Sequence, residues 1–205
     1  MHHVAQSRTP AVLLAMVLSL TLWSCLWPHD MATWLMEAFP VLVAVPLLVA
    51  TRKRFALTPL AYALIAAHAA ILLVGAHYTY AEVPLFNWLR DTYGLSRNHY
   101  DRVGHFAQGF VPALVIRELL LRTSPLYHGK WLMALVLFSC LGISALYEVI
   151  EWLAAAMSEN GAVAFLATQG DVWDTQKDMA LAGIGATLSL LLLPRWHDPQ
   201  LARLR

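Results

Sequence analysis

Charged residues are scarce in this sequence. Asp, Glu, Lys and Arg make up 13% of its 205 residues, whereas they make up about 25% of a typical soluble domain. The scarcity coincides with long uncharged apolar runs, so the sequence predicts an all-α protein in lipid, a polytopic membrane helix bundle. The formal net charge is only +1, which gives no basic surface for nucleic acid.

Cysteines and common catalytic motifs are also few. Cys25 and Cys140 both lie inside apolar runs, so they do not indicate a secreted disulfide framework. The sequence contains no G-x-S-x-G, Walker loop, H-E-x-x-H or C-x-x-C motif. Their absence argues against the usual hydrolase, nucleotide-hydrolysing, zinc-protease and thiol-redox classes. Internal repeats and linkers are missing too, and we expect a single integral membrane domain over residues 1–205.

Six apolar runs are long enough to be membrane spans. A spanning helix needs about 20 apolar residues and tolerates about 17. The runs cover roughly residues 10–27, 34–50, 58–76, 103–121, 131–157 and 179–193. We interpret the first run as an uncleaved span, because no cleavage site follows it. A short surface helix is predicted from Pro84 to Asp91, with Gly94 ending it.

Basic residues predict the orientation. They gather before the first run, between the second and third, between the fourth and fifth, and after the sixth. With six spans all four groups lie on one side, which the positive-inside rule makes cytoplasmic, so both termini are predicted inside. Tryptophans at the run ends are predicted interfacial anchors: Trp23, Trp27 and Trp34 outside, Trp131 and Trp196 inside.

Polar residues recur at helical spacing near the predicted outer ends of the last three spans. One helix face would carry Asp101, His105 and Gln108, a second Glu148 and Glu151, and a third Asp174 and Asp178. The third face continues through Ala182 and Gly185, small residues that favour close helix packing. We therefore expect the three polar faces to meet at one depth. With Asp171, six carboxylates face the cations Arg102 and Lys177, which leaves a formal charge of −4.

Carboxylates together with one imidazole are suitable ligands for a divalent ion such as Mg²⁺, Mn²⁺, Fe²⁺ or Zn²⁺. An alternative is a polar core that shares protons and is neutralised by Arg and Lys. The predicted metal ligands are His105, Glu148, Glu151, Asp174 and Asp178. The predicted catalytic groups are His105, Glu148 and Asp101, with Asp101 orienting the imidazole. The predicted substrate contacts are Arg102, Gln108, Gln176 and Lys177.

Three motifs carry a resemblance to a known family. They are SRNHYDRVGHFAQGF at residues 96–110, YEVIEW at 147–152 and QGDVWDTQKDM at 169–179. In this order they resemble the YjdF-type family of small bacterial inner-membrane proteins, over nearly the whole chain. The resemblance implies a multi-pass protein of the bacterial inner membrane, without an established biochemical function.

A more distant similarity is to VanZ-like membrane proteins, which carry His, Glu-x-x-Gln and Asp-x-x-x-Asn motifs on successive helices. His105, Glu148 and Asp174 correspond to these motifs. Glu151 and Asp178 depart from them, because the pattern has Gln and Asn there, and they make the present site more acidic. By analogy, this similarity implies chemistry on the cell envelope.

The sequence supports three functional hypotheses. The first is a metal-dependent enzyme or binding protein that acts at the outer leaflet on a lipid or envelope precursor, with membrane lipids as partners. The second is a transporter of protons or metal ions, although the polar residues crowd one side of the membrane. The third is a structural membrane protein whose polar cluster locks the bundle together.

Overall fold

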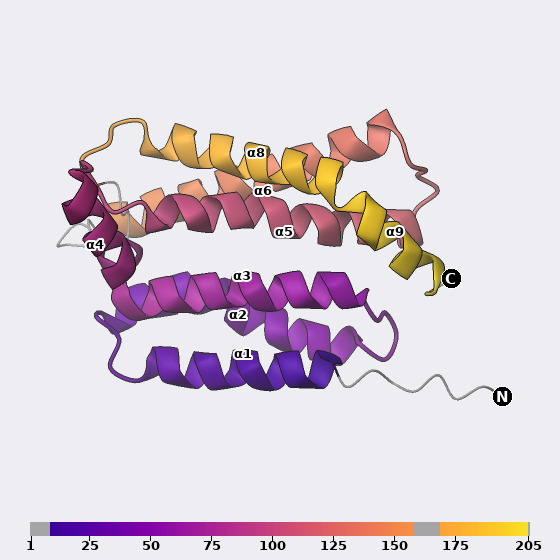
Figure 1. The fold of residues 1–205 in the computed structure, drawn as a ribbon, viewed down its shortest axis with the longest axis horizontal. Helices are drawn as coiled ribbons and strands as arrows, with labels where there is room; N and C mark the ends of the chain where they lie inside the picture. The colour runs from indigo at the N-terminus through magenta and orange to yellow at the C-terminus, as the bar shows by residue number, and fades with distance from the viewer. Residues whose placement is uncertain (1–8, 158–168, 205) are drawn as a thin grey trace.

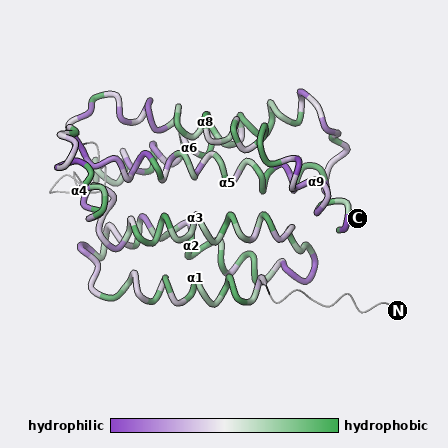
Figure 2. Tube along the Cα trace, viewed as in Figure 1, coloured by the Kyte–Doolittle hydropathy of each residue, from purple (hydrophilic) through white to green (hydrophobic). Residues whose placement is uncertain are grey.

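The computed structural model describes residues 9–157 and 169–204, and these residues are mainly helical, without a strand. Six long helices lie side by side along the molecule (Figure 1). They are α1 (Thr9–Cys25), α2 (Met31–Thr51), α3 (Pro59–Tyr78), α5 (Tyr100–Thr123), α6 (Lys130–Met157) and α8 (Asp174–Leu192). The prediction of an all-α bundle is confirmed, and each predicted span overlaps one of these helices. Polar residues concentrate toward the two ends of the bundle (Figure 2).

Length and composition do not qualify every helix as a span. Of the described helices, α2, α3 and α6 are long and apolar enough to cross a membrane. A fourth span results if α8 and the short α9 (Pro194–Ala202), bent by 61° relative to each other, count as one. Helix α1 is apolar but has 17 residues, and α5 carries several charges. The count of six spans and the orientation therefore stay predictions.

Local sequence signals place the helix ends. Asp30 caps α2 by accepting a hydrogen bond from the backbone amide of Thr33, at 2.7 Å. The single turn η1 (Tyr80–Glu82) leads into α4 (Pro84–Tyr93), which starts with a proline and ends where Gly94 adopts a left-handed φ of 62°. Proline at the first position and glycine just past the last are the expected helix boundaries. The predicted short helix is therefore confirmed.

The long helices form two groups of three, α1–α2–α3 and α5–α6–α8, and α3 packs on α5 to join them. In the first group the hydroxyl of Ser24 donates to the backbone oxygen of Leu73, at 2.6 Å. The indole of Trp34 donates to the same hydroxyl, at 2.9 Å. Trp34 is only 6% exposed, so the prediction that it anchors the bundle at the lipid interface was wrong. Its N–H is satisfied inside the protein rather than by headgroups.

Helices α5 and α8 approach closely because glycines face the contact. A Cβ atom on Gly109 would lie 1.8 Å from the backbone oxygen of Ala182, and one on Gly185 would lie 2.2 Å from that of Phe106. Both are far inside van der Waals contact, so neither position accepts a side chain without movement of the helices. The predicted close packing through Ala182 and Gly185 is confirmed. It brings the first turns of both helices together at one end of the bundle.

A separate polar network fixes the opposite end. Arg117 donates to Nδ1 of His197, at 2.8 Å, and Nε2 of His197 lies 3.0 Å from Glu118. Because a guanidinium only donates, His197 accepts at Nδ1 and donates at Nε2. Glu118 also receives hydrogen bonds from Thr58 and Arg122, at 2.7 Å each. The network holds α9 and the start of α3 against α5.

Candidate functional site

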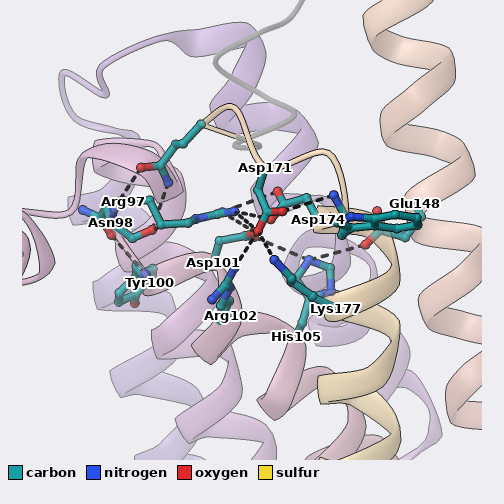
Figure 3. Close-up of polar contacts among 12 residues, drawn as sticks. Arg97, Asn98, Tyr100, Asp101, Arg102, His105, Glu148, Asp171, Asp174 and Lys177 are labelled. Atoms are coloured by element: carbon teal, nitrogen blue, oxygen red, sulfur yellow. Dashed lines mark hydrogen bonds and ion pairs between the residues drawn. The ribbon is translucent and has the colours of Figure 1, made fainter. Parts of the chain in front are cut away.

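The candidate site lies at the end of the bundle beside α4, where α5 and α8 begin and α6 ends. Helix α5 contributes Asp101 and His105 from its first turns, α6 contributes Glu148 from its last turns, and α8 contributes Asp174 and Asp178 from its start. The loop before α5 adds Arg97. Figure 3 shows Arg97, Asp101, His105, Asp174 and Glu148 pointing toward a common region. The structure therefore brings together side chains from three stretches that are distant in the sequence: α5 with the loop before it, α6 and α8.

The imidazole of His105 lies at the centre of this region. Its Nδ1 is 3.1 Å from Oε1 of Gln108, and its Nε2 is 3.4 Å from Asp101 and 3.7 Å from Glu148. If Nδ1–H donates to Gln108, a neutral ring turns the lone pair of Nε2 toward two carboxylates. A lone pair facing carboxylates is repulsive unless a proton or a metal ion lies between them. The geometry at Nε2 therefore favours either a proton on this nitrogen or a cation beside it.

Asp178 completes a compact set of possible ligands. One ligand atom from each of Asp101, His105 and Asp178 can be chosen so that all three lie within 4.8 Å of one another, and all three residues are buried. The Oδ1 of Asp178 and the Oε1 of Glu148 are buried and have no hydrogen-bond partner among the described residues. Buried polar atoms are normally paired. A proton on either carboxyl group, or a cation between them, would satisfy these two oxygens.

Arg97 provides the main positive charge beside these carboxylates. Its side chain is 3% exposed, and it donates to both oxygens of Asp174, with Nη2 to Oδ2 at 3.4 Å. The same guanidinium lies 3.6 Å from Asp101 and 3.8 Å from Asp171. Asn98, fully buried, holds the loop by donating to Asn87 of α4, at 2.8 Å. Arg97 is therefore fixed as the counter-ion of this acidic region.

Asp171 forms the outer edge of the site. It accepts hydrogen bonds from Lys177, at 2.6 Å, and from Arg102, at 2.9 Å. The hydrogen bond from Lys177, together with the backbone amide of Trp173, holds the pKa of the Asp171 carboxyl below its usual value. Asp171 is therefore charged and paired at neutral pH, which leaves it unsuited to bind an additional cation.

Comparison with known proteins identifies the family. Residues 9–199 match the family described as Predicted membrane protein (DUF2238). The chain belongs to this family. It is also 50% identical to the inner membrane protein YjdF of Escherichia coli (strain K12), over 98% of this chain and 97% of that protein. No solved structure matches the chain.

These findings confirm the resemblance to YjdF-type proteins. Together with the apolar helices, they place this DUF2238 protein in the inner membrane. They give no support to the more distant similarity to VanZ-like proteins. They also assign no reaction, metal or transported ion.

The predicted site residues of this DUF2238 chain divide into two groups. Asp101, His105, Glu148 and Asp178 meet at the centre. The others lie around them, and most have a protein partner. Glu151 is partly buried and interacts electrostatically with Glu148, and Gln176 is exposed. The partners of the rest are Arg97 for Asp174, His105 for Gln108, and Asp171 for both Arg102 and Lys177.

Two residues of the site region had no predicted role. Arg97 lies in the loop before α5, and its spacing of four residues from Asp101 was the signal for it. Glu37 is 1% exposed on α2 and interacts electrostatically with Asp101. The sequence feature that could have identified Glu37 is a carboxylate inside an apolar run. Counting both, seven carboxylates face three cations, so the region keeps a formal charge of −4 when His105 is neutral.

Proposed function

We propose that this protein binds a divalent cation through Asp101, His105 and Asp178 and uses it on the headgroup of a lipid or envelope precursor at the outer leaflet. The observation that carries the proposal is the buried carboxyl of Asp178: one of its oxygens lies within 4.8 Å of ligand atoms of His105 and Asp101, and its Oδ1 has no hydrogen-bond partner among the described residues. Two carboxylates and a neutral imidazole would balance the charge of a divalent ion. Oxygen and nitrogen ligands suit Mg²⁺, Mn²⁺, Fe²⁺ or Zn²⁺.

Glu148 and Arg102 would take complementary roles around the cation. The free Oε1 of Glu148, 3.7 Å from His105, would act as a fourth ligand or accept a proton from a bound water. A divalent ion polarises a phosphoryl or ester oxygen, or lowers the pKa of bound water toward about 7. The side chain of Arg102 is 26% exposed, with Nη2 on Asp171, so the exposed part of its guanidinium would donate to an anionic headgroup. Asp174 is left out of the ligand set, because it already pairs with Arg97.

A hollow beside these residues supports action on a headgroup. It has a volume of about 330 Å³ and is bounded by Gly170, Asp171, Val172, Asp174 and Thr175. It lies at the end of the bundle that the basic residues predict to be outside. Exposed Leu85 and Trp88 on α4, next to the site, suit the membrane surface. A polar group at the depth of lipid headgroups could therefore reach the cation.

The distribution of polar groups favours this function over transport. The site occupies one end of the bundle and the Glu118–His197 network occupies the other. Between them, α5, α6 and α8 bury an apolar cluster that includes Ala113, Val136 and Ala186. An ion crossing the membrane would need polar partners along this interval.

Metal binding by the purified protein in mild detergent tests the proposal. We would measure bound Zn, Mn and Fe by elemental analysis and titrate Mn²⁺ and Mg²⁺ into the wild type, Asp178→Asn and Glu148→Gln. Asp171→Asn is the matched control, because it makes the same change in a residue already paired with Lys177. We expect one ion per chain in the wild type and control, and affinity lower by at least about tenfold in Asp178→Asn.

The proposal fails if the wild type binds none of these ions. If, in addition, Asp178→Asn and Glu148→Gln unfold more easily than Asp171→Asn, the carboxylates act by sharing protons and the cluster is structural. The two results separate a metal site from a polar core.

A further inference from the structure

A groove runs along the outside of the bundle between α6 and α8. Its volume is about 360 Å³. Its walls are aliphatic or small, and Thr187 is their one hydroxyl-bearing residue. The other residues on the two walls are Leu137 and Leu141 of α6 and Ala180, Gly183, Ile184 and Leu188 of α8. In a membrane such a groove faces lipid rather than water.

The α6 wall of the groove leads toward the candidate site. Leu137, Leu141, Ser144 and Glu148 follow one another at i, i+4, i+7 and i+11, so they form one stripe along the helix. The first two line the groove, and Glu148 belongs to the site. Ser144 lies between them, fully buried, and its hydroxyl has no hydrogen-bond partner among the described residues. The stripe thus changes from apolar to polar in the direction of the site.

The α8 wall also changes from apolar to polar in the direction of the site. Toward the start of the helix, Ala180, Gly183 and Thr187 are continued by Lys177 and Gln176, three and four residues before Ala180. Thr175, in the turn above, interacts with the side chain of Glu148 and also borders the hollow of about 330 Å³ at the site. The polar hollow therefore lies at the start of α8 and the apolar groove farther along the same helix, with Gln176 and Lys177 between them.

We propose that the groove holds an acyl chain of a membrane lipid whose phosphate-bearing headgroup lies over Thr175 and Lys177. This inference rests on the proposed function and names its substrate class, a phospholipid-like amphiphile. A lipid combines an apolar chain with a charged head, as the groove and its mouth require. A second copy of the chain fits less well, because an apolar helix in the groove would cover the exposed polar residues Thr175, Gln176 and Lys177 at its mouth.

Photo-crosslinking with a defined lipid tests this proposal. The full-length protein is placed in phosphatidylglycerol–phosphatidylethanolamine nanodiscs that contain a phospholipid with a diazirine on one acyl chain. Mass spectrometry then maps the labelled residues. Gly183→Leu fills the groove, where a Cβ atom already lies 3.2 Å from Leu141. Gly142→Leu is the matched control, because a Cβ atom there meets nothing within 4 Å.

We expect labels to concentrate at the groove residues of the wild type and of Gly142→Leu. In Gly183→Leu they should fall about tenfold, equivalent to about 1.4 kcal/mol of binding. If Gly183→Leu does not fold, Ala180→Leu replaces it, since Ala180 is exposed. Even labelling of all lipid-facing helices, or labelling unchanged by the groove variants, overturns the proposal. Crosslinks between two protein copies at Gly183 also overturn it, in favour of a dimer.

Mn²⁺ titration of the same variants separates this inference from the proposed function. Gly183→Leu should bind Mn²⁺ as the wild type does, because it leaves Asp101, His105 and Asp178 unchanged. Groove labelling without Mn²⁺ binding would overturn the metal proposal and keep the lipid site. Mn²⁺ binding without groove labelling would overturn the lipid site and keep the metal proposal.

Discussion

Arg97 and Asp174 lie 77 residues apart in the sequence and form a buried ion pair. The guanidinium donates to both carboxylate oxygens, and the two side chains are 3% and 5% exposed. The pair joins the loop before α5 to the first turn of α8. It therefore closes the bundle at the site end, whereas Gly109 and Gly185 allow the two helices to approach nearer their middle.

Replacing Arg97 should destabilise the protein strongly. Arg97→Met leaves Asp174 buried without its counter-ion, which typically costs about 3–5 kcal/mol. Thermal unfolding in detergent, followed by tryptophan fluorescence, should show a clear fall in Tm. The double variant Arg97→Met/Asp174→Leu should recover part of the loss, because it removes both charges. Arg90→Met, which breaks the exposed pair with Asp91 on α4, is the control and should change little. A single variant as stable as the control would show that the pair does not hold the bundle.

Gly109 should tolerate no larger residue. In Gly109→Ala the new methyl group would overlap the backbone of Ala182, so α5 and α8 must separate. Overpacking of this kind costs about 1–3 kcal/mol, and more where backbone blocks the space. Gly142→Ala places the same methyl group in open space inside α6 and should not lower the stability, because Ala favours a helix over Gly by about 0.5–1 kcal/mol. Thermal unfolding of both variants in one detergent makes the comparison, and equal midpoints would contradict the close helix contact.

The sequence predicted what depends on local spacing. Long apolar runs set the helices, and the i, i+4 spacing of Asp101 and His105 placed both on one face of α5. It did not predict pairs that depend on how helices pack. Arg97 pairs with Asp174 only when the loop before α5 packs against α8. Trp34 is buried because Ser24 of another helix accepts its indole N–H. Helical periodicity ends at the loop, so it carries no information about such contacts.

The stability that the ion pairs of Asp171 contribute should depend on pH only below about pH 4. Its pKa is lowered in the folded protein, so the pairing stabilises the protein fully above the ordinary Asp pKa of about 3.9. That stability is lost as the pH falls through the lower folded value. The Tm difference between the wild type and Asp171→Asn should thus be constant from about pH 5 to about pH 8 and shrink below about pH 4. A difference that already shrinks between neutral pH and pH 5 would show that Lys177 does not hold this carboxylate.

The orientation of the site across the membrane is testable with two single cysteines. Val172 is at the site end and Tyr127 is in the connection between α5 and α6 at the other end, and both are 85% exposed. The native Cys25 is replaced by Ser, whereas Cys140 is fully buried and should not react. If the positive-inside prediction is right, a membrane-impermeant maleimide should label Val172→Cys in intact cells. Tyr127→Cys should be labelled only after permeabilisation.

The reverse pattern would place the acidic site on the cytoplasmic face, and the substrate would then have to be a lipid of the inner leaflet or a soluble cytoplasmic compound. Labelling of both cysteines in intact cells would instead show that the two ends lie on the same side, which would contradict a bundle whose long helices all cross the membrane.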